Sequence, residues 1–221
     1  LLMLSLTGVA LFQLLVYEGL RTTTTVNAVL LNSSAPLFMV LCSWVLERER
    51  ATRGQIAGML VSLVGIVIIM ARGEWAALRQ FELHLGDVWI LIAMPMWGVY
   101  SVLLKRKPPE IGGVLLLFLV AAGGVLLLLP WFVFSVAIHT PQLPGTGSIA
   151  GILYTALAAS IGAFICWNRG VAVVGANAAG VTLHLLPAFG TVLAILFLGE
   201  SFRAFHAAGI STILIGVVVA A

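Results

Sequence analysis

Long apolar runs separated by short polar segments fill this chain. A helix needs roughly 20 apolar residues to cross a bilayer, and runs of about that length cover most of the sequence. They lie at 1–20, 22–46, 55–71, 87–104, 111–138, 149–174, 177–198 and 205–221. Because backbone polar groups must be paired internally in lipid, we expect each run to be helical. The pattern predicts an all-α integral membrane protein with eight transmembrane helices in this chain.

The pattern also repeats along the chain. A displacement by 151 residues brings many glycine, proline and glutamate residues onto residues of the same type. The matched pairs include Gly19 and Gly170, Pro36 and Pro187, Glu49 and Glu200, Gly58 and Gly209, and Gly65 and Gly216. These residue types mark bends, close packing and helix ends, so the matches carry more weight than apolar ones. Residues 170–218 are therefore interpreted as a second copy of residues 19–67.

The second copy has two apolar runs, 87–104 and 111–138, ahead of the run that matches residues 1–20. Displaced in the same way, both would precede residue 1, so we expect two further N-terminal helices and ten in the full protein. The chain crosses five times between copies, and an odd number inverts the second copy, as in secondary transporters. The predicted units are 1–71, the last three helices of the first repeat, 72–85, the inter-repeat loop, and 86–221, the second five-helix repeat.

Composition and charge agree with a membrane protein. The chain is 62% hydrophobic and 9% charged, whereas soluble domains are about 25% charged. Its net charge of +3 does not indicate nucleic acid, because Lys and Arg gather in short loops. Cys42 and Cys166 lie in apolar runs, so a disulfide is not expected.

The loop charges predict an orientation. One alternate set of loops holds seven basic residues, namely Arg48, Arg50, Arg53, Lys105, Arg106, Lys107 and Arg169. The other set holds Arg21, Arg72, Arg79 and Arg203. Because positive loops stay in the cytoplasm, the richer set and the C-terminus are expected there. The predicted location is a bacterial inner (plasma) membrane, crossed many times.

Signatures of catalysis are absent from the sequence. It has no G-x-x-x-x-G-K-[ST], no H-E-x-x-H and no G-x-S-x-G, which argues against ATP hydrolysis and common hydrolase chemistry. Asp87 is the single Asp, and the cysteines and histidines lack metal-ligand spacing. We expect neither an enzyme nor a cofactor or metal.

Polar residues inside the apolar runs are candidates for a solute cavity. His184 belongs to a stripe on one helix face, formed by Asn177, Gly180, His184, Pro187 and Thr191. Such a stripe is costly against lipid, so it is expected to face protein or water. Two interpretations stay open: His184 is hydrogen-bonded between packed helices, or it contacts solute or carries a proton.

The second run repeats this theme without chemical symmetry. Asn32 is polar, and the displacement places it on Leu183 rather than on His184. Pro36 and Pro187 are aligned in mid-run, where proline bends a helix, and transporters place sites at such bends. Further cavity candidates, for which ordinary packing is the alternative, are Gln13, Trp97, Tyr100, Tyr154 and Trp167. Aromatic side chains with polar tips suit an amphipathic solute.

Several short motifs occur twice in the same order. Pro36-Leu-Phe precedes Leu46-Glu47-Arg48-Glu49, and Pro187-Ala-Phe precedes Leu198-Gly199-Glu200. With the paired glycines and the run from Met96 to Arg106, the whole chain resembles the EamA-like branch of the drug/metabolite transporter superfamily. The resemblance implies ten helices, cytoplasmic termini, a central cavity lined by both repeats, and export or exchange of small metabolites, often amino acids.

These observations favour a secondary transporter that works by alternating access around a midplane cavity. The expected partners are a small-molecule solute and the lipid bilayer, with proton coupling and oligomeric state left open and no nucleic acid. An intramembrane enzyme is one alternative, but it needs a convergent nucleophile and base that the sequence does not offer. A structural membrane subunit is another, but it has no need of polar stripes that face inward.

Overall fold

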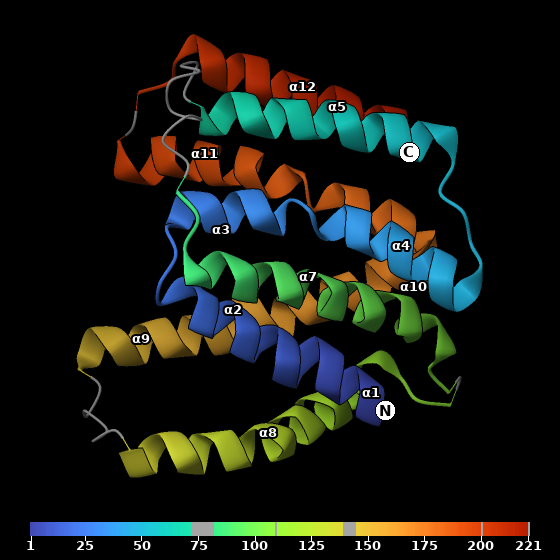
Figure 1. Cartoon of the computed structure of the whole chain (residues 1–221), viewed down its shortest axis with the longest axis vertical. Helices are drawn as coiled ribbons and strands as arrows, with labels where there is room; N and C mark the ends of the chain where they lie inside the picture. Colours follow the sequence, from blue (N-terminus) through green and yellow to red (C-terminus); the bar gives the residue numbers. More distant parts are fainter. Residues whose placement is uncertain (72–81, 109, 139–144, 200, 221) are drawn as a thin grey trace.

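The chain is helical throughout the part that the computed structural model describes, which is residues 1–71, 82–108, 110–138, 145–199 and 201–220 (Figure 1). The first half contains α1 (Leu2–Leu4), the π-helix η1 (Ser5–Leu11), α2 (Phe12–Leu20), α3 (Thr25–Asn32), α4 (Ala35–Glu47) and α5 (Arg53–Met70). The second half contains α7 (Leu85–Leu103), the 3-10 helix η2 (Leu104–Arg106), α8 (Gly113–Ile138), α9 (Thr146–Tyr154), the π-helix η3 (Thr155–Gly162), α10 (Ala163–Thr182), α11 (Leu185–Leu198) and α12 (Ala204–Ala220).

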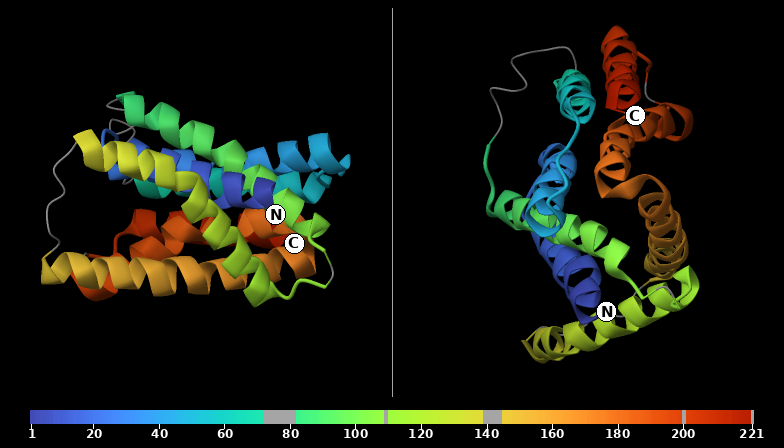
Figure 2. Two further views of the ribbon diagram at one scale, coloured as in Figure 1. Left: turned by 90° about the horizontal axis from the view of Figure 1, so that it is seen from below. Right: turned by 90° about the vertical axis from the view of Figure 1, so that its right-hand side faces the viewer.

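The helices run side by side between two ends of the molecule (Figures 1 and 2). Both chain termini lie toward one end, together with the turn at 48–52 and the residues that follow α7 at 104–108, and we call it the basic end. The opposite end carries the turns at 21–24 and 201–203. Within the described residues, six helical stretches are long and apolar enough to cross a membrane, and Leu185–Phe197 and Ala204–Ala220 are shorter apolar helices.

The longest stretch, Thr146–Thr182, is 37 residues long, which is more than one crossing needs. At Gly175 the backbone turns non-helical, with φ 83° and ψ 163°, a conformation that favours glycine. The chain reverses there, so α10 contributes to two passes (Figure 1). Counted in this way, the described residues make eight passes, and the predicted all-helical membrane fold is confirmed.

The two copies carry the same irregularities and run in opposite directions. The pass that holds α3 and α4 runs toward the basic end, whereas α11 runs away from it (Figure 1). Helix breaks follow Asn32 and Thr182. The displacement by 151 residues places these two positions within one residue of each other. The π-helical segments Ser5–Leu11 and Thr155–Gly162 also correspond. The sequence repeat is therefore a structural repeat with inverted orientation.

The last helices of the two copies, α5 and α12, pack against each other through glycines. The pairing is crossed: Gly58 lies against Gly216, and Gly65 lies against Gly209. A Cβ added to Gly65 would be 2.7 Å from the Gly209 carbonyl oxygen, and one added to Gly209 would be 2.8 Å from that of Gly65. Reciprocal contacts of this kind are what a two-fold relation between the copies produces, and close backbone approach stabilises helix pairs in membranes.

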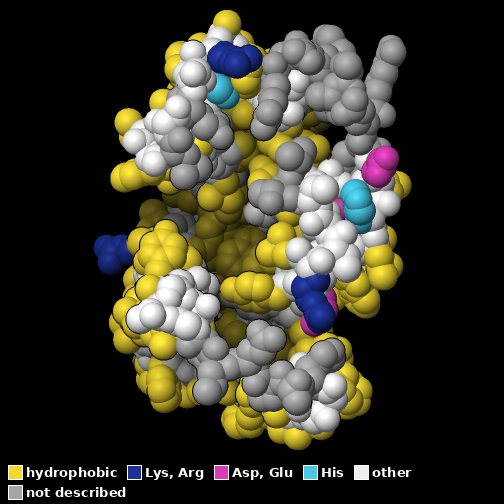
Figure 3. Space-filling model, turned by 90° about the vertical axis from the view of Figure 1, so that its left-hand side faces the viewer, with side chains coloured by type: hydrophobic (Ala, Val, Ile, Leu, Met, Phe, Trp, Pro, Cys, Tyr) yellow, Lys and Arg dark blue, Asp and Glu magenta, His cyan; other side chains and the backbone are white. Residues whose placement is uncertain are grey.

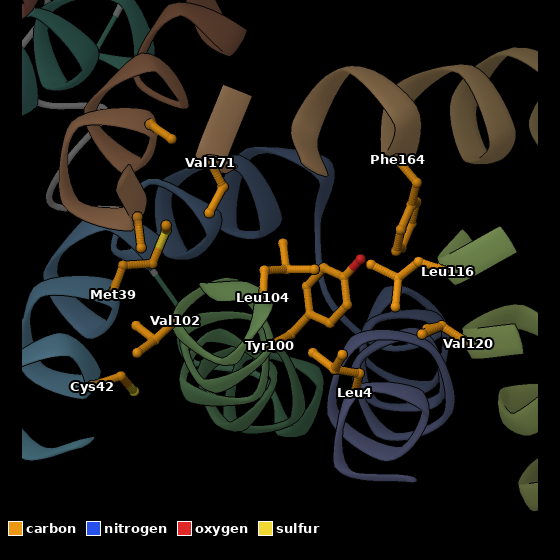
Figure 4. Packing of buried hydrophobic residues seen from close by; sticks show 12 residues of the cluster. Leu4, Met39, Cys42, Tyr100, Val102, Leu104, Leu116, Val120, Phe164 and Val171 are labelled. Carbon is orange, nitrogen blue, oxygen red and sulfur yellow. The ribbon is translucent and has the colours of Figure 1, made fainter. Parts of the chain in front are cut away.

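The largest buried cluster surrounds α7. Tyr100 lies at its centre, with Leu4, Leu116, Val120 and Phe164 close by (Figure 4). By contrast, α9 and η3 contain no buried residue. Helix α7 is thus the internal helix that positions the candidate site.

Candidate functional site

An aromatic cluster joins α2, α7 and α10 toward the basic end. The ring of Trp97 lies 4.8 Å from Phe12, 5.2 Å from Tyr100, 5.3 Å from Trp167 and 5.6 Å from Phe164, between centroids. Two hydrogen bonds hold it: the Tyr100 hydroxyl donates to Asn168 Oδ1 at 2.7 Å, and Trp167 Nε1 donates to Ser101 Oγ at 3.2 Å. The structure thus brings together three predicted candidates, Trp97, Tyr100 and Trp167.

A cavity of about 340 Å³ adjoins this cluster and shares Phe164 with it. Its polar groups come from Gln13 and Ser160, and the rest of its wall is apolar. Val9 and Ser160 are counterparts under the displacement, as are Gln13 and Phe164, and all four line the cavity. Equivalent helices of the two repeats therefore both contribute to its wall, while α8 adds Leu117 and other apolar groups.

His184 occupies the position where the two broken helices meet. Its side chain is fully buried, and its Nε2 lies 3.0 Å from the Ser33 carbonyl oxygen. Ser33 and His184 are counterparts under the displacement, so their contact marks the two-fold axis between the repeats. Residues at equivalent positions of two repeats contact each other only close to the two-fold axis that relates the repeats.

The Ser33 carbonyl needs this partner for a local reason. Proline has no N–H to give, so Pro36 cannot donate to it, and the N–H of Leu37 donates to Ser34 instead. A carbonyl only accepts, so His184 Nε2 carries the proton and donates. The other ring nitrogen, Nδ1, is buried without a partner among the described residues.

A smaller cavity of about 250 Å³ lies beside the helix breaks. Asn32, Ser33, Leu183, Pro187 and Thr191 line it, together with residues of α5. The cavity thus holds the predicted Asn32 and Pro187, whereas Pro36 is buried in the first turn of α4. His184 lies behind this wall rather than in it, which favours its packing interpretation.

Two predicted residues lie apart from these groups. Tyr154, in α9, is 69% exposed and is not part of the aromatic cluster. Asn177 follows the reversal at Gly175, and its Oδ1 is buried without a partner among the described residues. The structure does not bring either residue to the 340 Å³ cavity.

Sequence reasoning missed a polar network at the opposite end. Asp87, in the first turn of α7, is only 3% exposed. Its carboxylate accepts hydrogen bonds from Thr23 Oγ1, from Asn27 Nδ2 at 3.0 Å and from the His84 N–H at 2.8 Å. The spacing of His84 and Asp87 is that of a capping box, which was the available signal. The network ties α3 to the start of α7.

Ion pairs link α4 to α7 at the basic end. Lys105 Nζ lies 2.7 and 2.6 Å from the two carboxylate oxygens of Glu49, and Arg106 Nε lies 2.7 Å from Glu47. The Lys105 hydrogen bond is the main reason that the pKa of Glu49 lies below its ordinary value. Glu200, the counterpart of Glu49 in the second repeat, lies outside the described residues.

Comparison with known proteins identifies relatives along nearly the whole chain. The model of the EamA-like transporter family matches residues 1–71 and 84–221. The uncharacterized transporter YetK of Bacillus subtilis is 27% identical over 99% of this chain and 66% of its own length. A probable terminal-alkyne amino-acid exporter of Streptantibioticus cattleyicolor is 27% identical over 88% of this chain and 63% of its own length. The chain therefore spans about two thirds of the length of these curated relatives.

A solved crystal structure shares the fold. It has a TM-score of 0.78 and 20% sequence identity, and the match covers 98% of this chain and 72% of that chain. The relatives are named as transporters or exporters, in agreement with the expectation that the chain is not an enzyme. The family and the apolar helices together make it a multi-pass membrane protein.

Proposed function

Since the chain belongs to the EamA-like transporter family, we propose that the protein is a secondary transporter, an exporter or exchanger, of small amphipathic metabolites. Its repeats would rock about the axis at Ser33 and His184 and expose the cavity to one side and then to the other. The proposed units are the last three helices of the first repeat in residues 1–71 and the second, five-helix repeat in residues 86–221. The inter-repeat loop between them falls mostly on residues 72–81, outside the described part.

One observation carries this proposal: counterpart residues of the inverted repeats line the same 340 Å³ cavity. Alternating access needs a site between two elements that move against each other, and this cavity has that position. The paired π-helical segments η1 and η3 lie in the same passes, and such segments are frequent at functional sites. The twin helix breaks supply the hinges that rocking requires.

The composition of the cavity wall favours an amphipathic, uncharged or zwitterionic solute. The amide of Gln13 and the hydroxyl of Ser160 can bind a polar group, while the apolar wall accepts a side chain. Amino acids fit this description, and one relative is named as a probable amino-acid exporter. None of the described residues that line this cavity is Asp, Glu or His, so exchange or facilitated movement is favoured over proton coupling through it.

The shape supports a state that opens away from the basic end. The face at the opposite end is hollowed, with hydrophobic side chains deep inside (Figure 3), whereas the aromatic cluster and the Tyr100–Asn168 bond join α7 and α10 toward the basic end. We propose that the basic end and the C-terminus face the cytoplasm. Seven Lys and Arg residues gather at that end, as the positive-inside rule requires.

Flux into proteoliposomes tests the proposal. Purified protein is reconstituted into vesicles, and the uptake of labelled aliphatic and aromatic amino acids is measured with and without unlabelled solute inside. Gln13→Leu removes the amide from the cavity and is expected to lower flux by about tenfold, the value of roughly 1.4 kcal/mol of solute binding. The matched control is Thr212→Val, since Thr212 is exposed on α12 and bonds only to its own helix. Flux that Gln13→Leu leaves unchanged would remove this cavity from the solute path.

A further inference from the structure

A separate cavity of about 380 Å³ lies at the basic end, where α7 ends, α8 begins and α10 approaches Gly175. Lys107 and Arg169 contribute positive charge to it, and Asn168 contributes an amide. Leu104, Val114 and Ile165 are among its apolar wall residues. Val114 lines both this cavity and the 340 Å³ cavity, but the polar groups proposed to bind solute, Gln13 and Ser160, line only the latter.

No described residue neutralises the two cations. Lys107 Nζ donates one hydrogen bond, at 3.0 Å, to the Ile111 carbonyl, and this uncharged acceptor does not compensate its charge. Neither Lys107 nor Arg169 forms an ion pair with a described residue, and the cavity wall contains no described Asp or Glu. Lys105 close by differs, because Glu49 neutralises it. The cavity therefore favours an anion.

The apolar part of the wall continues onto the surface that faces lipid. Val114 is 74% exposed and Ile165 is 40% exposed, so the cavity opens sideways between α8 and α10. A free anion would make no favourable contact with the apolar wall. A molecule with an anionic headgroup and apolar chains can contact both the two cations and the apolar wall. We propose that the cavity binds an anionic phospholipid, with its phosphate on Lys107 and Arg169 and its acyl chains along α8 and α10. Basic pockets between transmembrane helices bind anionic headgroups in this way.

The bound lipid would also reach the closed end of the molecule. Asn168 lines the cavity, and its Oδ1 accepts the hydrogen bond from Tyr100. Its Nδ2 is a donor that none of the described residues accepts from, so it can bind a phosphate oxygen. The headgroup then lies one side chain away from the aromatic cluster.

Titration of the purified protein with short-chain phosphatidylglycerol, followed by native mass spectrometry, measures this binding. Lys107→Gln with Arg169→Gln is expected to raise the Kd about 25-fold, from roughly fivefold for each cation lost. The matched control removes two charges of the same end outside the cavity, Arg50→Gln with Arg53→Gln, and is expected to change the Kd less than about twofold. Phosphatidylcholine and inorganic phosphate are titrated in parallel, and both are expected to bind at least about tenfold more weakly.

A second pair of variants leaves every charge in place. Gly113 lines the cavity and its neighbour Gly112 does not, and an added Cβ meets no atom within 4 Å at either position. Gly113→Leu should fill the cavity and weaken lipid binding about tenfold, whereas Gly112→Leu should leave binding unchanged. This pair decides the matter if the charge variants fail to fold.

Three results would overturn the proposal. Equal binding of phosphatidylcholine would show that the charge is irrelevant, and equal binding of inorganic phosphate would show a free-anion site. Equal losses in a variant and its control would show attraction to the whole basic end. Because the assay measures binding without flux, its failure leaves the transport proposal untouched, and failed transport leaves the lipid site standing.

Discussion

At the scale of single residues, the contact between His184 and Ser33 explains why an imidazole stands in an apolar span. The break in the helix leaves the Ser33 carbonyl without a helical donor, and His184 supplies one from the other repeat. A buried carbonyl that loses its only partner costs about 1–3 kcal/mol. We therefore expect that His184 holds the two breaks together.

We predict that His184→Ala lowers the thermal midpoint of the detergent-solubilised protein by the equivalent of about 1–3 kcal/mol. The control is Thr191→Val on the same helix, whose hydroxyl bonds only to the Pro187 carbonyl of its own turn. The pH profile of flux between pH 5 and 8 should keep its shape in the variant. A changed profile at normal stability would return His184 to the interpretation in which it carries a proton.

The ion pair at the basic end gives a prediction in which the size of the stabilisation depends on pH. Lys105 holds the pKa of Glu49 below its ordinary value of 4.5. A carboxyl with a depressed folded-state pKa stabilises the fold above its unfolded pKa, and this stability is lost as the pH falls through the folded value. Both side chains are partly exposed, so the contribution is less than about 1 kcal/mol.

Glu49→Gln should therefore lower the thermal midpoint slightly at pH 7 and have no effect once the pH is below the folded pKa. Thermal scans from pH 3 to pH 7 measure this difference. Glu110→Gln is the control, because Glu110 is exposed and forms no ion pair with a described residue. A difference of the same size at every pH would mean that Glu49 acts through packing rather than charge.

Single residues also show what the sequence could predict. Periodicity identified the polar face of His184, because lipid excludes polar groups from the outside of a helix. Position inside an apolar run, together with a polar group, identified the candidates Gln13, Asn32, Trp97, Tyr100 and Trp167. The sequence pattern could not predict which residues these side chains contact. The contact of His184 is with the backbone carbonyl of Ser33 rather than with its side chain, and a side-chain pattern does not reveal such a contact. Tyr154 has the same chemistry as Tyr100, yet lies outside, since periodicity over a helix assigns no partner.

At the scale of helices, the packing of α5 against α12 depends on the crossed glycines. A methyl group at Gly65 would meet the Gly209 carbonyl and the Ile213 backbone nitrogen. Backbone atoms cannot move aside as a flexible side chain can, so the two helices must separate. The repeat implies an equivalent cost at Gly216, the counterpart of Gly65, where a Cβ would meet Gly58 and Ser62.

Gly65→Ala and Gly216→Ala are each expected to destabilise the protein by about 1–3 kcal/mol. Gly170→Ala is the control, because Gly170 lies inside α10 and an added Cβ there meets nothing within 4 Å. That change should be neutral or stabilising by up to about 1 kcal/mol through helix propensity. Thermal unfolding in detergent compares the three, and equal effects would contradict the glycine interface.

The helices themselves were largely predictable, and their interruptions were not. Run length and polarity placed each pass to within a few residues, and the inverted repeat followed from the displacement. The aligned prolines indicated bends, but the breaks lie a few residues earlier, at Ser33 and His184. A proline disturbs the turn before it, because its ring excludes a donor there. The π-helical segments η1 and η3 have no residue signature that would reveal them.

At the scale of the whole molecule, the candidate site is arranged around the two-fold axis between the repeats. This axis passes near the Ser33–His184 contact, it crosses the glycine pairs of α5 and α12, and it relates the counterpart residues that line the cavity. The two contributions are nevertheless unlike: Gln13 has an aromatic counterpart, Phe164, and Val9 has the polar counterpart Ser160. Because the two repeats share one fold, both can move in the same way. Because their cavity residues differ, the cavity can bind a solute in a single orientation.

Closure of the basic end then depends on contacts that must break when the cavity opens there. The hydrogen bond from Tyr100 to Asn168 spans α7 and α10 and is 2.7 Å long. Tyr100→Phe deletes this bond and keeps the ring in the aromatic cluster. Loss of about 1 kcal/mol should shift the balance between the two states about fivefold toward opening at the basic end.

Thiol labelling in intact cells measures that shift. The background carries Cys166→Ser, since Cys166 is exposed and Cys42 is buried, and Ser160→Cys reports on the cavity wall. With the basic end in the cytoplasm, an impermeant reagent added outside should label residue 160 more slowly once Tyr100→Phe is introduced, by at most about fivefold. Tyr17→Phe is the matched control, because Tyr17 is 54% exposed and outside the cluster. An unchanged rate in Tyr100→Phe would mean that the aromatic cluster does not close the path, and faster labelling would mean that the structure opens toward the cytoplasm.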